Sequence, residues 1–310
     1  MRAKETPVAG GFAFPEGPCV DRHGTLYLVE LPRGCVSVVA HGRRLEFATL
    51  GGAPNGAAFG ADGTLYVCNN GGNWPPKPST GGQPGTGGGQ ASIQAVRPDG
   101  SFKTLITAID GQSLNGPNDI CFDDKGGFYF TDPAWAKRSP EGIAHAEQSP
   151  PGNLCYVAGD GSATRVWGDL LFPNGLHVTP DGKALVVAET GTGRVWRFGI
   201  REPGNLDRAE VMIELGPASG LDGMCFDSEG RLLIAGCGSS RIYVLAADLR
   251  HLDQSIELGD PDPTNLCFGG PDYRTLYVTL GSSGAVVSIE WPVAGLRLFN
   301  AASAAAAPPD

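Results

Sequence analysis

The sequence predicts an all-β fold, a six-bladed β-propeller built from four-stranded antiparallel blades. Two observations support this prediction. One short phrase recurs six times along the 310 residues, and turn-forming residues are abundant, with 47 glycines and 25 prolines but no collagen period. Hydrophobic residues make up 41% of the chain and charged residues 18%, which is typical of a globular protein with a large core.

Each copy of the repeated phrase contains a polar residue, a short apolar strand, a turn with Asp or Gly, and a second apolar strand. The copies begin at Glu16, Asn55, Asn118, Asn174, Asp222 and Thr264. In the first five copies a glycine follows the polar residue by eight positions, as a tight turn with positive φ between two strands requires. The mean spacing of about 50 residues matches the blade size of propeller repeats.

Weaker strand pairs lie between the copies and complete each blade. They read AVRPDGSFKTLI, CYVAGDGSATRVW, RVWRFGI and RIYVLAADL. A β-sandwich or two smaller β domains would also show closely spaced strands, but neither predicts one motif six times. We therefore expect one propeller domain over residues 1–300 and a low-complexity tail over residues 301–310. Either end of the chain could complete the last blade.

The net negative charge of the chain disfavours nucleic acid as a partner. A formal net charge of -10 argues against binding to nucleic acid, which requires a basic surface. The start of the chain lacks the apolar run of a secretory signal, and no stretch of about 20 apolar residues could cross a membrane. We expect a cytoplasmic protein with a small-molecule substrate, no nucleic-acid partner and no membrane contact, while the oligomeric state stays open.

Eight cysteines do not indicate a disulfide framework. Four of them occupy the same position of the repeat, and none forms a CxxC pair. These four are Cys19, Cys121, Cys225 and Cys267. We interpret them as small hydrophobic residues of the core, since a chain of this length does not need covalent links to hold its fold.

The residues that open the six copies are all oxygen donors. In a propeller the first strand of each blade lines the central channel, so equivalent residues converge on the axis at one mouth. Carboxylates and carboxamides gathered there favour one hard divalent cation, with Glu16, Asn174 and Asp222 as the first candidate ligands. No histidine is among the openers, which disfavours a His-rich zinc site. Taken singly, an Asn or Asp before Gly can also serve only as a turn cap.

Two long loops return to the same mouth, because loops after each second strand lie on the face opposite to the short Asp-containing turns. These loops span residues 71–90 and 133–153. Long loops in a compact fold are often binding loops. Trp74 and Trp135 are therefore candidate walls of a substrate pocket, although either ring could instead pack against its own loop.

Five motifs are together similar to the gluconolactonase family that includes senescence marker protein (regucalcin). The motifs are FPEGP, LNGPND, FTDP, FPNGLHVTPDG and LDGMCFD, and the resemblance runs from about Phe14 to Gly281. It implies a six-bladed propeller that hydrolyses sugar lactones with an axial metal. The metal ligands implied are Glu16, Asn174 and Asp222. Asn118 is implied as a contact to substrate or metal-bound water, and we place the candidate substrate contacts at Asn118, Asn55, Asn115 and Trp135.

One position departs from the family pattern. Bacterial members usually carry a basic residue two positions before the first Asn of the LNSPND motif, whereas this chain has Ser113. Gly116 replaces the serine of that motif, which is a milder change. A missing cation beside the pocket would alter contacts to a substrate hydroxyl or carboxylate, so the natural lactone can differ from gluconolactone.

The mechanism expected is metal-assisted hydrolysis of a cyclic ester, in which Asp222 accepts the proton of the attacking water. Calcium is our first choice of cation, while zinc, magnesium, manganese and iron(II) stay open. No GxSxG motif indicates a serine hydrolase. Two alternatives stay open: a hydrolase or lyase of the same fold acting on something other than a sugar lactone, and a non-catalytic calcium-binding propeller.

Overall fold

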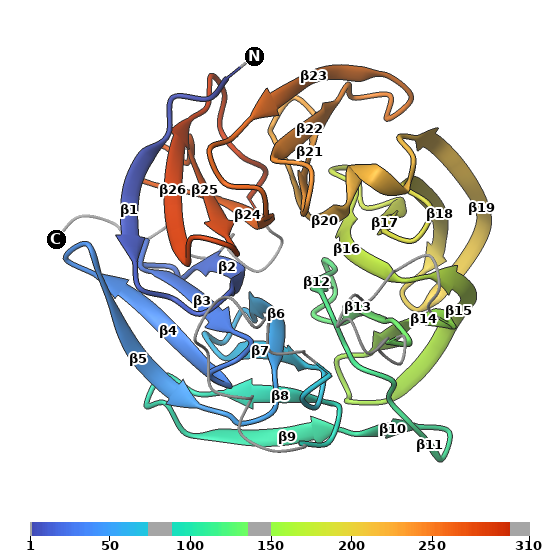
Figure 1. Cartoon of the computed structure of the whole chain (residues 1–310). Helices are drawn as coiled ribbons and strands as arrows, with labels where there is room; N and C mark the ends of the chain where they lie inside the picture. The colour runs from blue at the N-terminus through green and yellow to red at the C-terminus, as the bar shows by residue number, and fades with distance from the viewer. Residues whose placement is uncertain (1, 74–88, 136–149, 298–310) are drawn as a thin grey trace, which may run out of the picture.

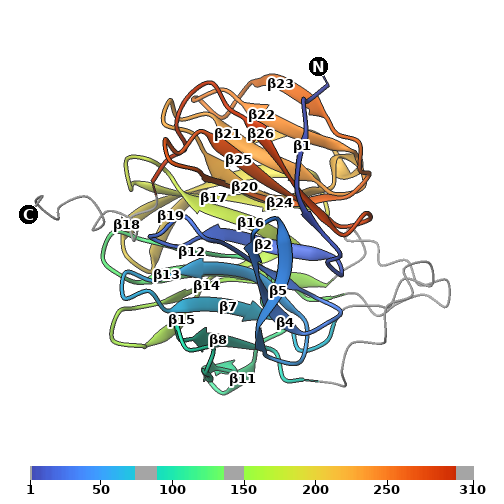
Figure 2. The same cartoon turned by 90° about the vertical axis from the view of Figure 1, so that its left-hand side faces the viewer.

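The computed structural model describes residues 2–73, 89–135 and 150–297, and these form six antiparallel sheets arranged in a circle around one axis (Figure 1). Each sheet has four strands, so the predicted six-bladed propeller is confirmed. In blades 1 to 5 the strands run in chain order from the axis outwards, and Figure 2 shows the blades from the side. No helix in the described part of the chain is long and apolar enough to cross a membrane.

The first three blades follow one another along the chain. Blade 1 contains β2 (Pro15–Val20), β3 (Leu26–Glu30), β4 (Cys35–Ala40) and β5 (Arg43–Thr49). Blade 2 contains β6 (Pro54–Phe59), β7 (Leu65–Asn69), β8 (Ser92–Val96) and β9 (Phe102–Ile106). A two-stranded hairpin, β10 (Ala108–Ile109) and β11 (Gln112–Ser113), leads to blade 3. Blade 3 contains β12 (Ile120–Phe122), β13 (Phe128–Asp132), β14 (Pro151–Val157) and β15 (Ala163–Leu171).

Of the remaining three blades, blade 4 has the longest outer strands, and blade 6 takes its outermost strand from the N-terminal segment. Blade 4 contains β16 (Pro173–Val178), β17 (Ala184–Glu189), β18 (Arg194–Glu202) and β19 (Asn205–Glu214). A 3-10 helix, η2 (Pro217–Ser219), precedes blade 5. Blade 5 contains β20 (Leu221–Phe226), β21 (Leu232–Gly236), β22 (Arg241–Leu245) and β23 (Leu252–Glu257). Blade 6 contains β24 (Pro263–Gly269), β25 (Thr275–Leu280), β26 (Ala285–Glu290) and β1 (Thr6–Gly10).

The N-terminal strand closes the circle. β1 pairs antiparallel with β26, with Thr6 opposite Ser288 and Gly10 opposite Ala285, and so forms the outermost strand of blade 6 (Figure 1). The last blade is therefore built from both ends of the chain. This answers the question of closure that the sequence left open.

The turns between the first two strands of each blade form as predicted. Gly24, Gly63, Gly126, Gly182 and Gly230, eight positions after the opening residues, all have φ between 71° and 82°. Only glycine adopts this conformation without strain. An Asp side chain closes several of these turns by accepting backbone N–H groups.

The inner strands are irregular where they begin. The pairing register shifts directly after the opening residue in β2 and across the opening residue in β6, β16, β20 and β24. A bulge at such a point turns a side chain out of the regular alternation of the strand. Apolar clusters fill the space between neighbouring blades; in one, Ile242 of blade 5 packs with Leu266 and Phe268 of blade 6.

Candidate functional site

Five of the six opening residues gather at one end of the inner strands. We call them the polar ring: Glu16, Asn55, Asn118, Asn174 and Asp222. All five are buried, and their exposed fractions range from 3% to 8%. Asn174 hydrogen-bonds Asp222, and the charge of Glu16 acts on Asp222, so the three residues predicted as metal ligands lie together.

Glycines allow the inner strands of neighbouring blades to approach closely at the ring. Directly after the ring residue, four blades carry a glycine that packs against the opening segment of the next blade. A Cβ at Gly17 would lie 2.6 Å from Asn55 O, one at Gly56 2.5 Å from Asn118 O, and one at Gly175 2.2 Å from Asp222 O. Real Cβ atoms do not approach backbone oxygens this closely, so the glycine that follows the ring residue in these three blades is required for blade packing.

Thr264, the sixth opener, does not join the polar ring. Its hydroxyl group donates to Pro15 O at 2.7 Å and lies 2.8 Å from Thr279 Oγ1. The expectation that all six openers face the mouth is therefore wrong at blade 6, because Thr264 links blade 6 to the first strand of blade 1.

Two further polar side chains take the axial positions beside the ring, and neither was predicted from the sequence. Asp119 and Asn265 occupy the place that is glycine in the other four blades, directly after the opener. Asn265 Nδ2 donates to Glu16 Oε2 at 3.0 Å, and Asn265 also hydrogen-bonds Asp119. We call this pair the axial floor. The sequence carries one signal for these two residues: the glycine that follows the opening residue in four copies is absent from the third and sixth copies.

Burial dominates the electrostatics of the site. Burial and the charge of Asp119 raise the pKa of Glu16 to about 8, against the opposing effect of the Gly17 N–H and Asn265. Burial raises the pKa of Asp119 to about 7. The pKa of Asp222 is also raised well above its ordinary value by burial, then by Glu16 and Asp119. Three carboxyl groups thus share one buried region and make each other's ionisation costly.

A divalent cation fits this set of donors. Glu16 and Asp222 offer negative charge, and Asn174, Asn118 and Asn55 offer neutral oxygens, which is the donor chemistry of hard cations. Among the residues that the structure describes, no three His, Cys, Asp or Glu side chains are placed to hold a metal. A cation in the polar ring would therefore depend on carboxamides and water for much of its coordination, as the sequence suggested.

A cavity of about 730 Å³ lies on the other side of the axial floor. It is lined by the short turns at residues 21–24, 60–63 and 269–271, and it reaches Asp119 and Asn265, but it includes no residue of the polar ring. The floor separates this cavity from the ring.

The four repeated cysteines line this cavity in addition to packing between the blades. Cys19, Cys121, Cys225 and Cys267 all contribute to its wall, and all eight cysteines are free thiols. Burial raises the pKa of each of these four thiols, so they stay neutral. The expectation of unpaired, apolar cysteines is confirmed, with the added finding that they face the channel.

The other predicted substrate contacts lie in loops around the mouth. Asn115 is exposed, and its Nδ2 donates to Asp132 O at 3.3 Å. Trp135 is half-buried: its Nε1 donates to Gly116 O at 3.0 Å, and its ring meets Phe172 edge to face at 4.9 Å. Trp135 thus packs on the LNGPND loop and on Phe172 rather than on its own loop, and its role as a wall of a substrate pocket stays a prediction. Trp74 lies outside the described residues.

Ser113, the position of the missing basic residue, is exposed in β11. A guanidinium group does lie nearby, because Arg165 of β15 donates to Ile109 O at 2.7 Å and to Ser113 O at 3.3 Å. Arg165 uses these bonds to hold the β10–β11 hairpin from an outer strand. It does not replace a cation at the polar ring.

The circle of six blades and the buried oxygen donors at one end of the inner strands define the class of this protein: a six-bladed β-propeller with a buried polar ring at one end of its inner strands. The chain belongs to the SMP-30/gluconolactonase/LRE-like family, whose model matches residues 14–282. This confirms the resemblance found in the sequence motifs.

Similar proteins cover most of the chain. The diisopropyl-fluorophosphatase of Loligo vulgaris is 27% identical over 92% of this chain and 91% of its own length. The gluconolactonase of Zymomonas mobilis is 25% identical over 73% of this chain and 60% of its own. The solved structure of a gluconolactonase from Xanthomonas campestris covers 94% of this chain and 90% of its own, with 23% identity and a TM-score of 0.75. This last likeness supports the fold alone.

Proposed function

We propose that the protein is a metal-dependent lactonase that opens a sugar lactone to its aldonic acid at the polar ring. The observation that carries this proposal is the pair of buried carboxylates, Glu16 and Asp222, placed with the carboxamide of Asn174 at one end of the inner strands. Burial and mutual repulsion disfavour two negative charges there unless a cation compensates them. Membership of a family that includes gluconolactonases supports the choice of substrate.

Each ring residue has a distinct role in the proposal. Glu16, Asn174 and Asp222 hold the cation, with calcium as first choice, and Asn118 and Asn55 bind the substrate or its water. When bound, the cation supplies Lewis-acid stabilisation of the developing oxyanion. Asp222 accepts the proton of the attacking water, because Glu16 is already committed to the Gly17 N–H and Asn265.

The experiment is an assay of acid release from aldono-1,5-lactones, with and without chelator. We expect Asp222→Asn and Glu16→Gln to lose at least about a hundredfold in kcat/KM, the scale of a lost general base or metal site. Asp160→Asn, an isosteric change in an exposed turn, is the matched control and should keep full activity. Full activity of either ring variant, or indifference to chelator, would refute the proposal.

A second candidate is hydrolysis of a phosphorus ester or fluoride at the same ring. It is favoured by one observation: the similarity to a diisopropyl-fluorophosphatase extends over nearly the whole of both chains. A panel that sets sugar lactones against aryl esters and fluorophosphonates separates the two. A kcat/KM at least about tenfold higher for the phosphorus substrates would favour the second candidate.

A further inference from the structure

The second strand of blades 1 to 4 ends in a residue whose side chain accepts a backbone N–H. These end residues are Glu30, Asn69, Asp132 and Glu189, and all are buried. In every case the N–H belongs to the segment that leads into the ring residue of the same blade. Blade 5 ends its second strand at Gly236 and has η2 before its ring residue instead.

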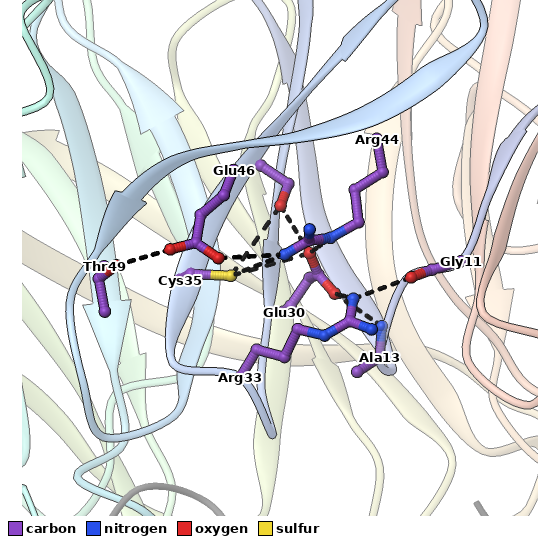
Figure 3. A network of polar contacts seen from close by, with 9 residues as sticks. Gly11, Ala13, Glu30, Arg33, Cys35, Arg44, Glu46 and Thr49 are labelled. Carbon is purple, nitrogen blue, oxygen red and sulfur yellow. Dashed lines mark hydrogen bonds and ion pairs between the residues drawn. The ribbon is translucent and has the colours of Figure 1, made fainter.

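In blade 1 the anchor is Glu30. Its Oε2 accepts the Ala13 N–H at 2.7 Å, three residues before Glu16, and also the guanidinium group of Arg33 (Figure 3). Its Oε1 accepts Ser37 Oγ at 2.5 Å and the Nε of Arg44. A carboxylate without solvent exposure is thus fully paired and fixed in place.

In blade 4 the anchor is Glu189, and the geometry repeats. Its Oε1 accepts the Leu171 N–H at 2.7 Å, three residues before Asn174. Its Oε2 accepts Thr192 Oγ1 at 2.5 Å and Trp196 Nε1 at 2.9 Å. Blades 1 and 4 lie on opposite sides of the axis (Figure 1).

The two anchored segments share a strained backbone. Each runs through a Phe-Pro pair, and Phe14 and Phe172 have φ of 45° and 53°. A non-glycine residue in this region is strained and persists only where neighbouring contacts hold it. The carboxylates bind the N–H immediately before each phenylalanine, so they fix the turn from which Glu16 and Asn174 project.

We propose that Glu30 and Glu189 are positioning residues for the axial cation: each orients a ligand on its own blade through the backbone, from opposite sides of the ring. This inference rests on the proposed metal function of Glu16 and Asn174. Neither glutamate is among the proposed ligands. Outer partners of this kind typically contribute about 10–100-fold to metal affinity.

The test is calorimetric titration of the metal-free protein with CaCl2, combined with the melting temperature of the metal-free protein. We expect Glu189→Ala to weaken calcium binding at least about tenfold. Glu189→Gln keeps an acceptor for the Leu171 N–H and should stay within about threefold of the unmodified chain. Glu189→Asp keeps the charge but is shorter by one methylene, so it should weaken binding several-fold. If affinity followed charge alone, Asp would preserve it and Gln would not.

Trp196→Phe is the matched control, because it removes another partner of Glu189 and leaves the Leu171 contact in place. It should lower the melting temperature without changing calcium affinity. Lowered melting temperatures with unchanged affinity in Glu189→Ala and Glu189→Asp would overturn the positioning role. If the unmodified chain itself bound no divalent cation, the proposed function would fail first and this role with it.

Discussion

Glu16 illustrates how a single side chain in the polar ring is balanced between opposing effects. Its Oε2 accepts the Gly17 N–H at 2.7 Å and Asn265 Nδ2 at 3.0 Å, both of which favour the ionised form. Burial and the neighbouring Asp119 outweigh them and raise its pKa to about 8. Burial and Asp119 therefore favour the protonated form of this carboxyl group in the metal-free protein.

Metal binding should consequently depend on pH. A cation requires the carboxylate form, so binding below about pH 8 must displace the proton of Glu16. We expect the dissociation constant for calcium to fall roughly tenfold per pH unit between pH 6 and 8 for each proton displaced. Calorimetry in buffers of different ionisation enthalpy measures both the affinity and the proton release. An affinity independent of pH, without proton release, would contradict the raised pKa.

The stability of the metal-free protein should fall as pH rises, whereas its calcium affinity should increase. The folded-state pKa of Glu16 lies above its ordinary value of 4.5, so the native state binds more protons than the unfolded state between these values. The contribution of Glu16 to the free energy of unfolding is thus present below about pH 4.5 and is lost as pH rises towards 8. Asp119→Asn is the control: because the charge of Asp119 raises the pKa of Glu16, both pH dependences should shift to lower pH.

Among individual site residues, the sequence predicted those that open the repeated phrase. The gathering of Glu16, Asn174 and Asp222 was predictable because equivalent positions of a propeller meet on its axis. Asp119 and Asn265 were missed because they replace glycines that looked like turn residues. The prediction that Thr264 belongs to the polar ring was wrong because its hydroxyl group donates a hydrogen bond to a backbone oxygen, Pro15 O, instead.

At the scale of the elements, the inner strands pack through their glycines. β16 meets β20 where Gly175 lies against the carbonyl group of Asp222, and a Cβ there would be 2.2 Å from the oxygen. The clash would involve backbone on both sides, so no rotamer change can relieve it. Asp222 and the residue before Gly175, Asn174, both belong to the polar ring, so the spacing of these two ring residues depends on the absence of a Cβ at Gly175.

Gly175→Ala should therefore destabilise the fold and weaken metal binding together. We expect a loss of about 1–3 kcal/mol in the free energy of unfolding, the usual cost of forcing extra volume into packed structure. Gly168→Ala in β15 is the matched control, since its Cβ would meet no atom closer than 3.6 Å. Denaturant unfolding and calcium titration of both variants give the comparison. Equal stability of the two variants would count against the role of these glycines.

The elements themselves were predictable to different degrees. The first two strands of each blade follow from the repeated phrase, since alternating apolar residues and a turn glycine define them locally. The outer strands vary more, from the five residues of β9 to the ten of β19, because one face meets solvent. The β10–β11 hairpin was not predicted, because its two-residue strands carry no periodic signal.

For the whole molecule, the decisive feature is how the circle closes. Both chain ends contain short segments that could form an outer strand, and such strands carry little apolar patterning. The pairing of β1 with β26 is therefore a property of the closed circle, in which the last blade must find a fourth strand within reach. Nearby, Ala3 N donates to Glu257 O at 3.0 Å and Gly259 N to Glu5 Oε1 at 2.8 Å, so the same segment also ties blade 6 to blade 5.

Removal of residues 1–10 should accordingly expose β26 as a free edge. An unpaired edge strand offers its N–H and C=O groups to other chains, so we expect concentration-dependent self-association as well as a lower melting temperature. A loss of about 2 kcal/mol would lower it by about 4–8 °C, if a domain of this size behaves like those of 150–250 residues. A shorter truncation that keeps Thr6–Gly10 is the control and should remain monodisperse. Light scattering and thermal unfolding decide the matter: if both truncated chains behaved alike, β1 would contribute nothing to closure beyond the contacts of residues 2–5.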